Sequence, residues 1–472
     1  MRMSTGAWIG GEERLLERRY GVISPVTGEV LAEVADAGPA EAREALEHAV
    51  RAFERWRKTP PYERSAVLGR WFEAILANAE ELAQLMTLEM GKVIREARGE
   101  VAYAAGFVEF YAEEIKRAAG EYLASRAPHR RVLVRYEPVG PVYAITPWNF
   151  PAAMVTRKVA PAVAAGATVV LKPAEESPLT ALYLARLFHK AGGPPGVLQV
   201  LPTTDPAAFS RPFFEDARVR KLTFTGSTEV GLRLYVEAAK TLKRVSLELG
   251  GGAPAVVFAD ADLDRAVNEL IRAKFRNSGQ SCIAANRFFV EARIAEVFAE
   301  RYAEAVSRLK VGDPRDETTD VGPLVNPQAL EKVRAHVEDA ARRGAKTVVG
   351  GAGEGLYFRP TVLLDVPPDA RVMREETFGP VAPVAVFETE EEAVRLANAS
   401  EAGLAAYLFT ENLGRAFRVS EALEYGIVAI NEGVPSTPEA PFGGVKFSGI
   451  GREGGRQGLF EYLEAKYVAL AL

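Results

Sequence analysis

The spacing of hydrophobic residues changes about a third of the way along the chain. Up to about residue 120, apolar positions recur at steps of three and four, the period of one face of an amphipathic helix. The clearest such face, on one helix or a helix pair, consists of Leu68, Phe72, Ile75, Leu76, Ala79, Leu82, Leu85 and Met86. Pro39 is placed to open a first helix, and Gly91 is placed to close a later one. We interpret this stretch as helical scaffold.

From about Pro141, short apolar runs rich in β-branched residues alternate with helical segments. The runs predict strands at Val142–Thr146, Thr168–Leu171, Val197–Leu201, Leu222–Thr225, Val245–Leu249 and Ala255–Phe258. Further helices are predicted near Asp262–Ser278, Arg293–Leu309 and Ala329–Arg343. Strands separated by helices are typical of an α/β fold with a parallel sheet covered on both faces. Ligands bind such sheets beyond the carboxyl ends of the strands.

The overall composition narrows the class of protein. A chain of 472 residues exceeds what one hydrophobic core usually supports, so we expect two or three domains. A net charge of -5 gives no electrostatic basis for binding nucleic acid or an acidic membrane. No apolar stretch approaches the roughly 20 residues of a membrane-spanning helix, and the first residues lack the apolar core of a signal peptide. We expect a soluble cytoplasmic protein.

The only cysteine, Cys282, lies in the polar segment FRNSGQSCIAANRFFV. A lone cysteine is more often a buried structural thiol, but glycine, amide and small polar side chains surround this one. A free thiol ionises near pH 8.5, so a nucleophilic role needs assistance from the site. Glu248 is the candidate base, because burial at the end of an apolar strand raises the pKa of a carboxyl toward neutrality. The four histidines lie in helical or surface-like contexts away from these loops, which disfavours a Cys–His hydrolase.

Three predicted strand ends carry polar residues of possible function. In Pro147–Pro151, prolines on both sides stiffen the turn and hold the Asn149 amide at the sheet edge, where it could stabilise an oxyanion. Lys172 and Glu175 follow the next strand and suit the hydroxyls of a ribose. Gly226 and Ser227 open a helix whose free N–H groups and positive dipole end suit a phosphate. Taken singly, each has a structural explanation: a turn asparagine, a loop start or a helix cap.

The Gly226 turn is not one of the common nucleotide-binding loops. Leu232 and Arg233 occupy the positions of Lys and Ser/Thr in a P-loop. The G-x-G-x-x-G dinucleotide fingerprint occurs in none of the strand–helix turns of this part. Any dinucleotide site would therefore have to be formed by the three turns together.

Seven motifs follow one another in a specific order: ITPWNFP, LKPAEESP, FTGSTEVG, LELGG, GQSC, EETFGP and PFGGVKFSGIGREGG. In this order the chain resembles the NAD(P)-dependent aldehyde dehydrogenases over nearly its whole length. The resemblance implies a Rossmann-type cofactor domain, an α/β catalytic domain and a small β oligomerisation element. The implied boundaries are 1–120 with 139–249, 250–453, and 121–138 with 454–472. The apolar tail would complete a partner's sheet in a homodimer or homotetramer.

The same resemblance assigns roles to individual residues. It implies that Cys282 is the nucleophile, that Asn149 and the backbone N–H of Cys282 form the oxyanion hole, and that Glu248 activates water to hydrolyse a thioester. Lys158 and Glu453 have supporting roles, and no metal is implied. The implied cofactor contacts are Thr146, Pro147, Trp148, Lys172, Glu175, Gly226, Ser227, Glu376 and Phe378. A carboxylate at Glu175 bonds a free 2′-hydroxyl and repels a 2′-phosphate, so we expect NAD to be preferred, with NADP possible.

Three further positions concern the substrate. Arg157, Arg276 and Ser436 resemble residues of succinate-semialdehyde dehydrogenases, where two guanidiniums and a hydroxyl can hold a distal carboxylate. The structural alternative is that both arginines pair with carboxylates of the chain. Other substrates that stay open are glutarate semialdehyde and a broad range of aliphatic aldehydes.

Two other activities are disfavoured by the residues present. Glu248 favours hydrolysis over transfer of the acyl group to CoA. A catalytically inactive dinucleotide-binding relative would be expected to lack the nucleophile or the base, and both are here.

Two positions depart from the family pattern. Gly252 follows LELGG where a lysine is frequent, which leaves the local packing open. Ala284 stands where some succinate-semialdehyde dehydrogenases carry a second cysteine, so a redox switch through an intrachain disulfide is excluded.

Overall fold

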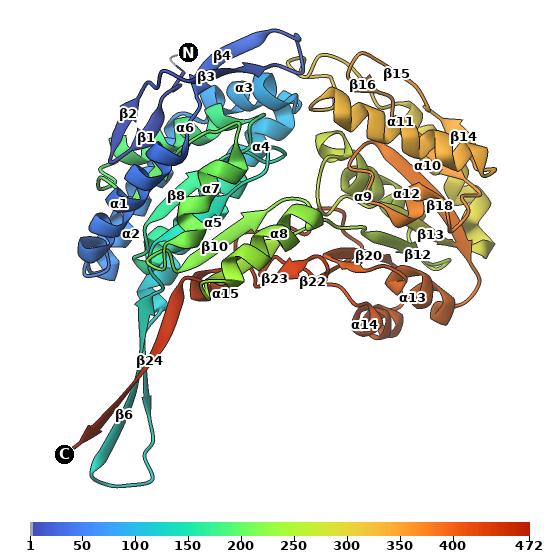
Figure 1. The fold of residues 1–472 in the computed structure, drawn as a ribbon. Helices are drawn as coiled ribbons and strands as arrows, with labels where there is room; N and C mark the ends of the chain where they lie inside the picture. The colour runs from blue at the N-terminus through green and yellow to red at the C-terminus, as the bar shows by residue number, and fades with distance from the viewer. Residues whose placement is uncertain (1–2) are drawn as a thin grey trace.

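The computed structural model describes residues 3–472, which form two lobes and a projecting arm (Figure 1). Among these residues, no helix combines the length and the apolar character needed to cross a bilayer. The same residues contain no group of three or more His, Cys, Asp or Glu side chains able to hold a metal ion.

The first lobe is built on an eight-stranded sheet. Its strands, in spatial order, are β2 (Glu12–Arg14), β1 (Ala7–Ile9), β9 (Leu198–Val200), β8 (Val169–Lys172), β7 (Val142–Ile145), β10 (Lys221–Thr225), β11 (Arg244–Glu248) and β23 (Gly449–Ile450). The block from β9 to β11 is parallel, whereas β1, β2 and β23 join antiparallel at the edges. The α/β class is confirmed, and the five strands of the parallel block coincide with the first five predicted runs to within one or two residues.

Helices cover this sheet and supply most of the apolar core. They are α1 (Pro39–Trp56), α2 (Pro61–Ala77), α3 (Ala79–Met90), α4 (Ile94–Glu114), α5 (Ala153–Ala165), α6 (Pro178–Lys190), α7 (Pro206–Glu215) and α8 (Thr228–Ala239). A short 3₁₀ turn, η1 (Ile115–Arg117), follows α4, and β3 (Arg19–Ile23) pairs with β4 (Val30–Ala35) in a separate hairpin. The predicted apolar face divides between α2 and α3, and Leu76, just before the break at Asn78, is exposed.

The second lobe contains a seven-stranded sheet. Its order is β14 (Lys346–Val349), β17 (Thr361–Leu364), β18 (Val381–Phe387), β13 (Arg287–Glu291), β12 (Pro254–Val257), β20 (Ala405–Phe409) and β21 (Ile427–Ile430). The last predicted run, Ala255–Phe258, thus belongs to this sheet. The helices of the lobe are α9 (Leu263–Phe275), η2 (Arg276–Gly279), η3 (Ala292–Ile294), α10 (Ala295–Ser307), α11 (Pro327–Arg342), α12 (Arg371–Arg374), α13 (Glu390–Asn398) and α14 (Leu413–Ala422). Two small pairs are β15 (Gly353–Glu354) with β16 (Tyr357–Phe358), and β19 (Ala402–Gly403) with β22 (Val445–Lys446).

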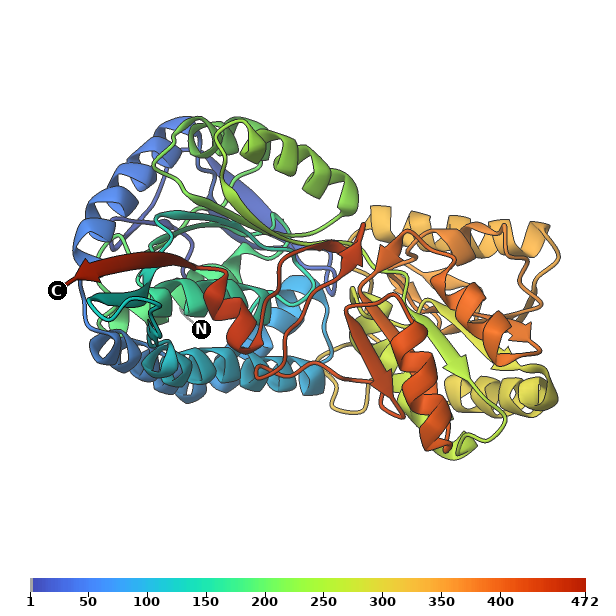
Figure 2. The ribbon, with the colours of Figure 1, turned by 90° about the horizontal axis from the view of Figure 1, so that it is seen from below.

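The arm consists of three antiparallel strands that extend away from the first lobe (Figures 1 and 2). After α15 (Gly455–Phe460), β24 (Leu463–Ala471) pairs along its whole length with β6 (Arg130–Pro138), and β5 (Glu121–Leu123) lies on the other side. β24 therefore forms one edge of this sheet. The domain boundaries stay a prediction, and β23, placed by them in the catalytic part, pairs with β11 of the first sheet.

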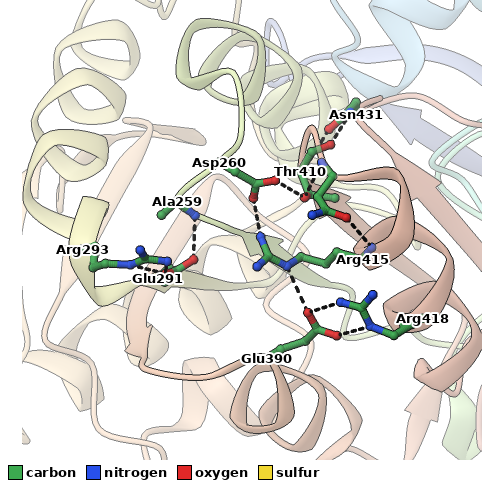
Figure 3. A network of polar contacts seen from close by, with 10 residues as sticks. Ala259, Asp260, Glu291, Arg293, Glu390, Thr410, Arg415, Arg418 and Asn431 are labelled. Atoms are coloured by element: carbon green, nitrogen blue, oxygen red, sulfur yellow. Dashed lines mark hydrogen bonds and ion pairs between the residues drawn. The ribbon is translucent and has the colours of Figure 1, made fainter.

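A polar network fixes the carboxyl ends of β12 and β20 (Figure 3). Asp260 accepts a hydrogen bond from the Thr410 hydroxyl at 2.8 Å and forms an ion pair with Arg415, which also contacts Glu390. Asn431 exchanges two hydrogen bonds with the Thr410 backbone, at 3.1 and 2.9 Å. The network anchors the chain where the loop that carries Ser436 begins.

Candidate active site

Both lobes contribute side chains to a cavity of about 350 Å³. The residues that the sequence predicts for the chemistry meet here: Asn149, Glu248, Cys282, Glu376 and Phe378 all line it. The carboxyl ends of β7, β10 and β11 supply the first-lobe side of the wall, as expected for a parallel sheet. The second lobe supplies the cysteine and the segment that follows α12.

Cys282 is half-buried and follows η2 in a tightly folded loop. Asn277 and Ser278 have φ values of 55° and 56°, a left-handed conformation that is unusual outside glycine. A Cβ added at Gly251 would lie 2.3 Å from the Cys282 carbonyl oxygen, so only glycine allows this close approach. Burial raises the pKa of the Cys282 thiol to about 12, and the Arg157 charge opposes that shift. The thiol is therefore protonated at neutral pH.

Glu248 ends β11 and is buried, with 2% of its surface exposed. Within the described chain, neither of its carboxylate oxygens has a hydrogen-bond partner. Burial, reinforced by the negative charge of Glu453, raises the pKa of Glu248 well above its ordinary value. Unpartnered oxygens and a raised pKa are the properties of a general base.

Behind Glu248 lies a buried ion cluster. Glu453 forms ion pairs with Lys158 and with Arg157, whose Nε lies 2.6 Å from Glu453 Oε2. Lys158 also donates to the Thr225 hydroxyl at 2.7 Å. Burial raises the pKa of Glu453, but the two cations outweigh it and hold that pKa below its usual value. The structural alternative for Arg157, pairing with a carboxylate of the chain, is thus realised.

Asn149 is buried, and its amide Nδ2 donates to the Gln280 carbonyl at 3.2 Å, on the cysteine loop. Its Oδ1 has no hydrogen-bond partner among residues 3–472. The neighbouring Trp148 packs edge-on against Phe378 with ring centroids 5.5 Å apart. Phe378 itself has a left-handed φ of 54°. The two predicted turns therefore meet across the lobes.

On the substrate side, the structure adds a residue that the sequence analysis missed. Burial raises the pKa of Tyr103 on α4, and Arg157, Arg276 and Ser436 lie close enough to its hydroxyl to oppose that rise. The Arg276 guanidinium lies 5.3 Å from the ring centre of Phe150. All three predicted substrate residues thus approach one tyrosine. Tyr103 belongs to a helical pattern without a motif, so only the tertiary arrangement identifies it.

A second cavity, of about 790 Å³, adjoins the first and shares Pro147, Trp148 and the Gly226–Ser227 turn with it. Its wall includes Thr146, Lys172 and Glu175. Ser227 caps the N-terminus of α8, a twelve-residue helix, and its hydroxyl accepts a hydrogen bond from Val230 N–H. This N-terminus borders both cavities. Together the cavities offer an elongated site, with Lys172 and Glu175 among the charged side chains at one end.

Glu376 lies at the other end of this elongated site. It accepts a hydrogen bond from Gly251 N–H at 3.0 Å, and burial raises its pKa to about 7. The N-terminal turn of α11 also contributes Gln328, Ala329 and Lys332, which the sequence analysis treated as plain helix.

One histidine lies on a helix, as expected, and also contacts a segment next to the site. His336 of α11 is fully buried, and its ring nitrogens bond Thr377 at 3.1 Å and Glu375 at 3.2 Å, on either side of Glu376. It thus contacts an active-site segment, because α11 packs against the chain that follows α12. It does not line the cysteine cavity.

A half-buried thiol, a buried carboxylate without hydrogen-bond partners and an elongated cavity thus meet at the carboxyl edge of the first sheet. The model of the aldehyde dehydrogenase family matches residues 8–468, and the chain belongs to this family. It is 50% identical to the glutarate-semialdehyde dehydrogenase of Pseudomonas putida over 99% of this chain and 97% of that one. It is 48% identical to the NADP(+) succinate-semialdehyde dehydrogenase GabD of Escherichia coli, over 96% and 94% of the two chains. The crystal structure of succinate-semialdehyde dehydrogenase from Burkholderia pseudomallei superposes with a TM-score of 0.98 at 49% identity, covering 100% and 98%.

Proposed function

We propose that the protein oxidises succinate semialdehyde to succinate with NAD(P), through a thioester on Cys282. The observation that carries this proposal is the grouping of Arg157, Arg276 and Ser436 around Tyr103, with both guanidiniums within electrostatic range of Cys282. An ω-oxo acid has two ends, and this arrangement offers a separate site for each. Two relatives with 48% and 49% identity bear the name of this activity.

The residues at the reacting end have complementary tasks. The Cys282 sulfur attacks the aldehyde carbon after losing its proton, and the Asn149 amide donates to the oxygen that becomes negative. A bound nicotinamide ring supplies the hydride acceptor. Glu248 then takes a proton from water, and the hydroxide attacks the thioester and releases the acid. Glu453 adds negative charge near Glu248 and raises its pKa, whereas Lys158 and Arg157 of the same ion cluster oppose that rise.

The elongated cavity fits a dinucleotide. Glu376 and Phe378 would hold the nicotinamide ribose beside Cys282, and the α8 N-terminus with Ser227 would hold the pyrophosphate. Gly250 supports this fit, because a Cβ there would approach Glu376 Oε2 to 3.0 Å.

We propose a preference for NAD over NADP. The Glu175 carboxylate pairs with the Lys172 ammonium at 3.0 Å, and both residues line the second cavity. Such a carboxylate accepts bonds from a 2′-hydroxyl, whereas it repels a 2′-phosphate. One relative is named for NADP(+), so the family also includes enzymes that use NADP. Replacing Glu175 by Ser should raise kcat/KM with NADP relative to NAD.

Steady-state kinetics with succinate semialdehyde and butyraldehyde tests the substrate. Loss of one charge-assisted bidentate bond costs about 1.5–3 kcal/mol, so Arg276→Ala should raise the KM for succinate semialdehyde roughly ten- to hundredfold. Butyraldehyde lacks the carboxylate, so the KM for butyraldehyde should change little. Arg272→Ala is the matched control, because this exposed arginine on the neighbouring turn pairs with Glu269. Equal effects on both aldehydes would contradict the proposal.

Glutarate semialdehyde is a second candidate substrate, favoured by the 50% identical relative that bears its name. It differs from succinate semialdehyde by one methylene, for which an apolar pocket discriminates by only about 1–3 kcal/mol. Comparison of kcat/KM for the four- and five-carbon semialdehydes decides between them.

We further propose a cytoplasmic homodimer or homotetramer. β24 presents an unpaired edge, and Tyr467, Leu470 and Leu472 leave much of their apolar surface exposed. A second copy of the chain would cover this strand.

A further inference from the structure

A buried ion pair of the first lobe holds the backbone of the predicted oxyanion-hole residue. Lys92, between α3 and α4, pairs with Glu100 of α4, and their side chains are 0% and 1% exposed. Lys92 Nζ also donates to the Asn149 carbonyl oxygen at 2.9 Å and lies 3.7 Å from the ring centre of Phe150. One ammonium thus contacts both Asn149 and the next residue.

The carboxylate of the pair fixes the same turn from its other side. Glu100 Oε1 accepts hydrogen bonds from the N–H groups of Ala152 and Ala153, at 2.9 and 3.1 Å, where α5 begins. Lys92 and Glu100 together therefore clamp the chain from Asn149 to Ala153. The helix that starts here carries Arg157 and Lys158, so the clamp also sets where the ion cluster begins.

The cysteine loop closes the third side. Asn277 Nδ2 donates to the Asn149 carbonyl at 2.9 Å and to the Gln280 carbonyl at 3.0 Å. The Asn149 side chain donates to that same Gln280 carbonyl. The Asn149 carbonyl thus receives two donors, and its amide is aligned with the loop that presents Cys282.

A buried ion pair is a weak source of stability, because the desolvation of both charges offsets their attraction. Its value here is geometric: displacement of a catalytic group by about 1 Å can cost about a hundredfold in rate. We infer that Lys92, held by Glu100, is a positioning residue for the oxyanion hole and acts on catalysis through Asn149. This inference rests on the oxyanion role proposed for Asn149.

The test compares Lys92→Met, Lys92→Arg, Glu100→Gln, Asn149→Ala and the Lys92→Met/Asn149→Ala double variant. Lys243→Met is the control, because Lys243 is also buried and donates to two main-chain carbonyls, those of Asp216 and Val219, both at 2.8 Å. The readouts are NADH formation in a single turnover, with succinate semialdehyde and with butyraldehyde, and the melting temperature.

Lys92→Met should slow NADH formation about tenfold or more, and by the same factor for both aldehydes, because the carbonyl end is affected. Lys92→Arg should recover part of the rate, and Glu100→Gln should lose an intermediate amount. The double variant should be no slower than Asn149→Ala. Lys243→Met should keep the wild-type rate even where its melting temperature falls as far as that of Lys92→Met.

Two results would overturn the inference: a Lys92→Met rate within threefold of wild type, or an equal Lys92→Met effect with and without Asn149. If Lys92→Met does not fold, Lys92→Arg and Glu100→Gln decide, and wild-type rates in both refute the positioning role. A wild-type rate in Asn149→Ala would instead remove the oxyanion role itself, and the inference with it. The variants therefore distinguish a loss of the oxyanion role of Asn149 from a loss of the positioning role of Lys92.

Discussion

At the scale of single residues, burial raises the pKa of both the thiol and the carboxyl of the site, but the strongest neighbouring charges act on them in opposite directions. Cys282 is protonated because burial disfavours its thiolate, and Arg157 only partly offsets this. Glu248 is protonated more readily than an ordinary glutamate, because burial and Glu453 both disfavour its charge. Both groups therefore need a rise in pH, or a change of surroundings on binding, to reach their reactive forms.

The pH dependence of thiol alkylation follows from this. Since the pKa of Cys282 is about 12 in the cofactor-free enzyme, the thiolate fraction, and with it the iodoacetamide rate, should climb about tenfold per pH unit from pH 7 to pH 9. Mass spectrometry of the sole cysteine gives the rate directly. Cys282→Ser should take up no label at this position and should lack dehydrogenase activity. A plateau below pH 8 would contradict the raised pKa.

Replacement of the base separates the two halves of the reaction. Glu248→Gln keeps the size of the side chain but cannot accept a proton, so hydrolysis of the thioester should slow roughly a hundredfold or more. Stopped-flow absorbance should then show a burst of about one NADH per active site, followed by a slow steady state. A wild-type steady-state rate without a burst would argue against Glu248 as the base.

At the scale of elements, the loops that bear the site are held by polar contacts of the strands beneath them. Asn431 has a left-handed φ of 56° and bonds the Thr410 backbone twice, at the start of the loop that carries Ser436. The Thr410 hydroxyl donates in turn to Asp260, which forms an ion pair with Arg415 (Figure 3). The position of Ser436 is therefore set by contacts at the far end of its loop.

Asn431→Ala should raise the KM for succinate semialdehyde several-fold while leaving the KM for NAD unchanged. Two lost hydrogen bonds and a strained φ should also lower the free energy of unfolding by about 1–3 kcal/mol. Asn412→Ala is the matched control: Asn412 caps α14 nearby through Arg415 N–H, so its loss costs about 1 kcal/mol of stability without reaching the loop. Equal KM changes in both variants would assign the effect to general destabilisation.

The elements differ in how far the sequence predicts them. β7, β8 and β10 are buried along their whole length, and their apolar and β-branched residues identify them in the sequence. β2 and β23 are short, with exposed or glycine residues, and only long-range pairing makes them strands. The motifs likewise locate Cys282 and Glu248. They do not reveal Tyr103, the Lys92–Glu100 pair or the left-handed Phe378, which depend on contacts between distant segments.

At the scale of the whole molecule, the arm of a single chain ends in a strand with one unpaired edge. β24 has β6 on one side and an open edge on the other, and it projects beyond the first lobe (Figure 1). Exposed strand edges promote pairing with other chains.

Removal of residues 465–472 should therefore lower the oligomeric state. Size-exclusion chromatography with light scattering should show a smaller assembly for the truncated protein than for the full chain. Leu413→Asp is the control, because this exposed leucine lies on α14 of the other lobe and its replacement should leave the mass unchanged. An unchanged mass after truncation would exclude β24 as the contact.

The pairing of β23 with β11 has a consequence for recombining this enzyme with its relatives. Gly449 sits opposite Glu248, so a segment more than 200 positions downstream completes the sheet beside the base. In a chimera that exchanges residues 1–249 alone, β23 would come from one parent, and β11, the strand that ends at Glu248, would come from the other. Transplanting the first lobe intact requires a second crossover ahead of Gly449, so that the terminal stretch travels with it.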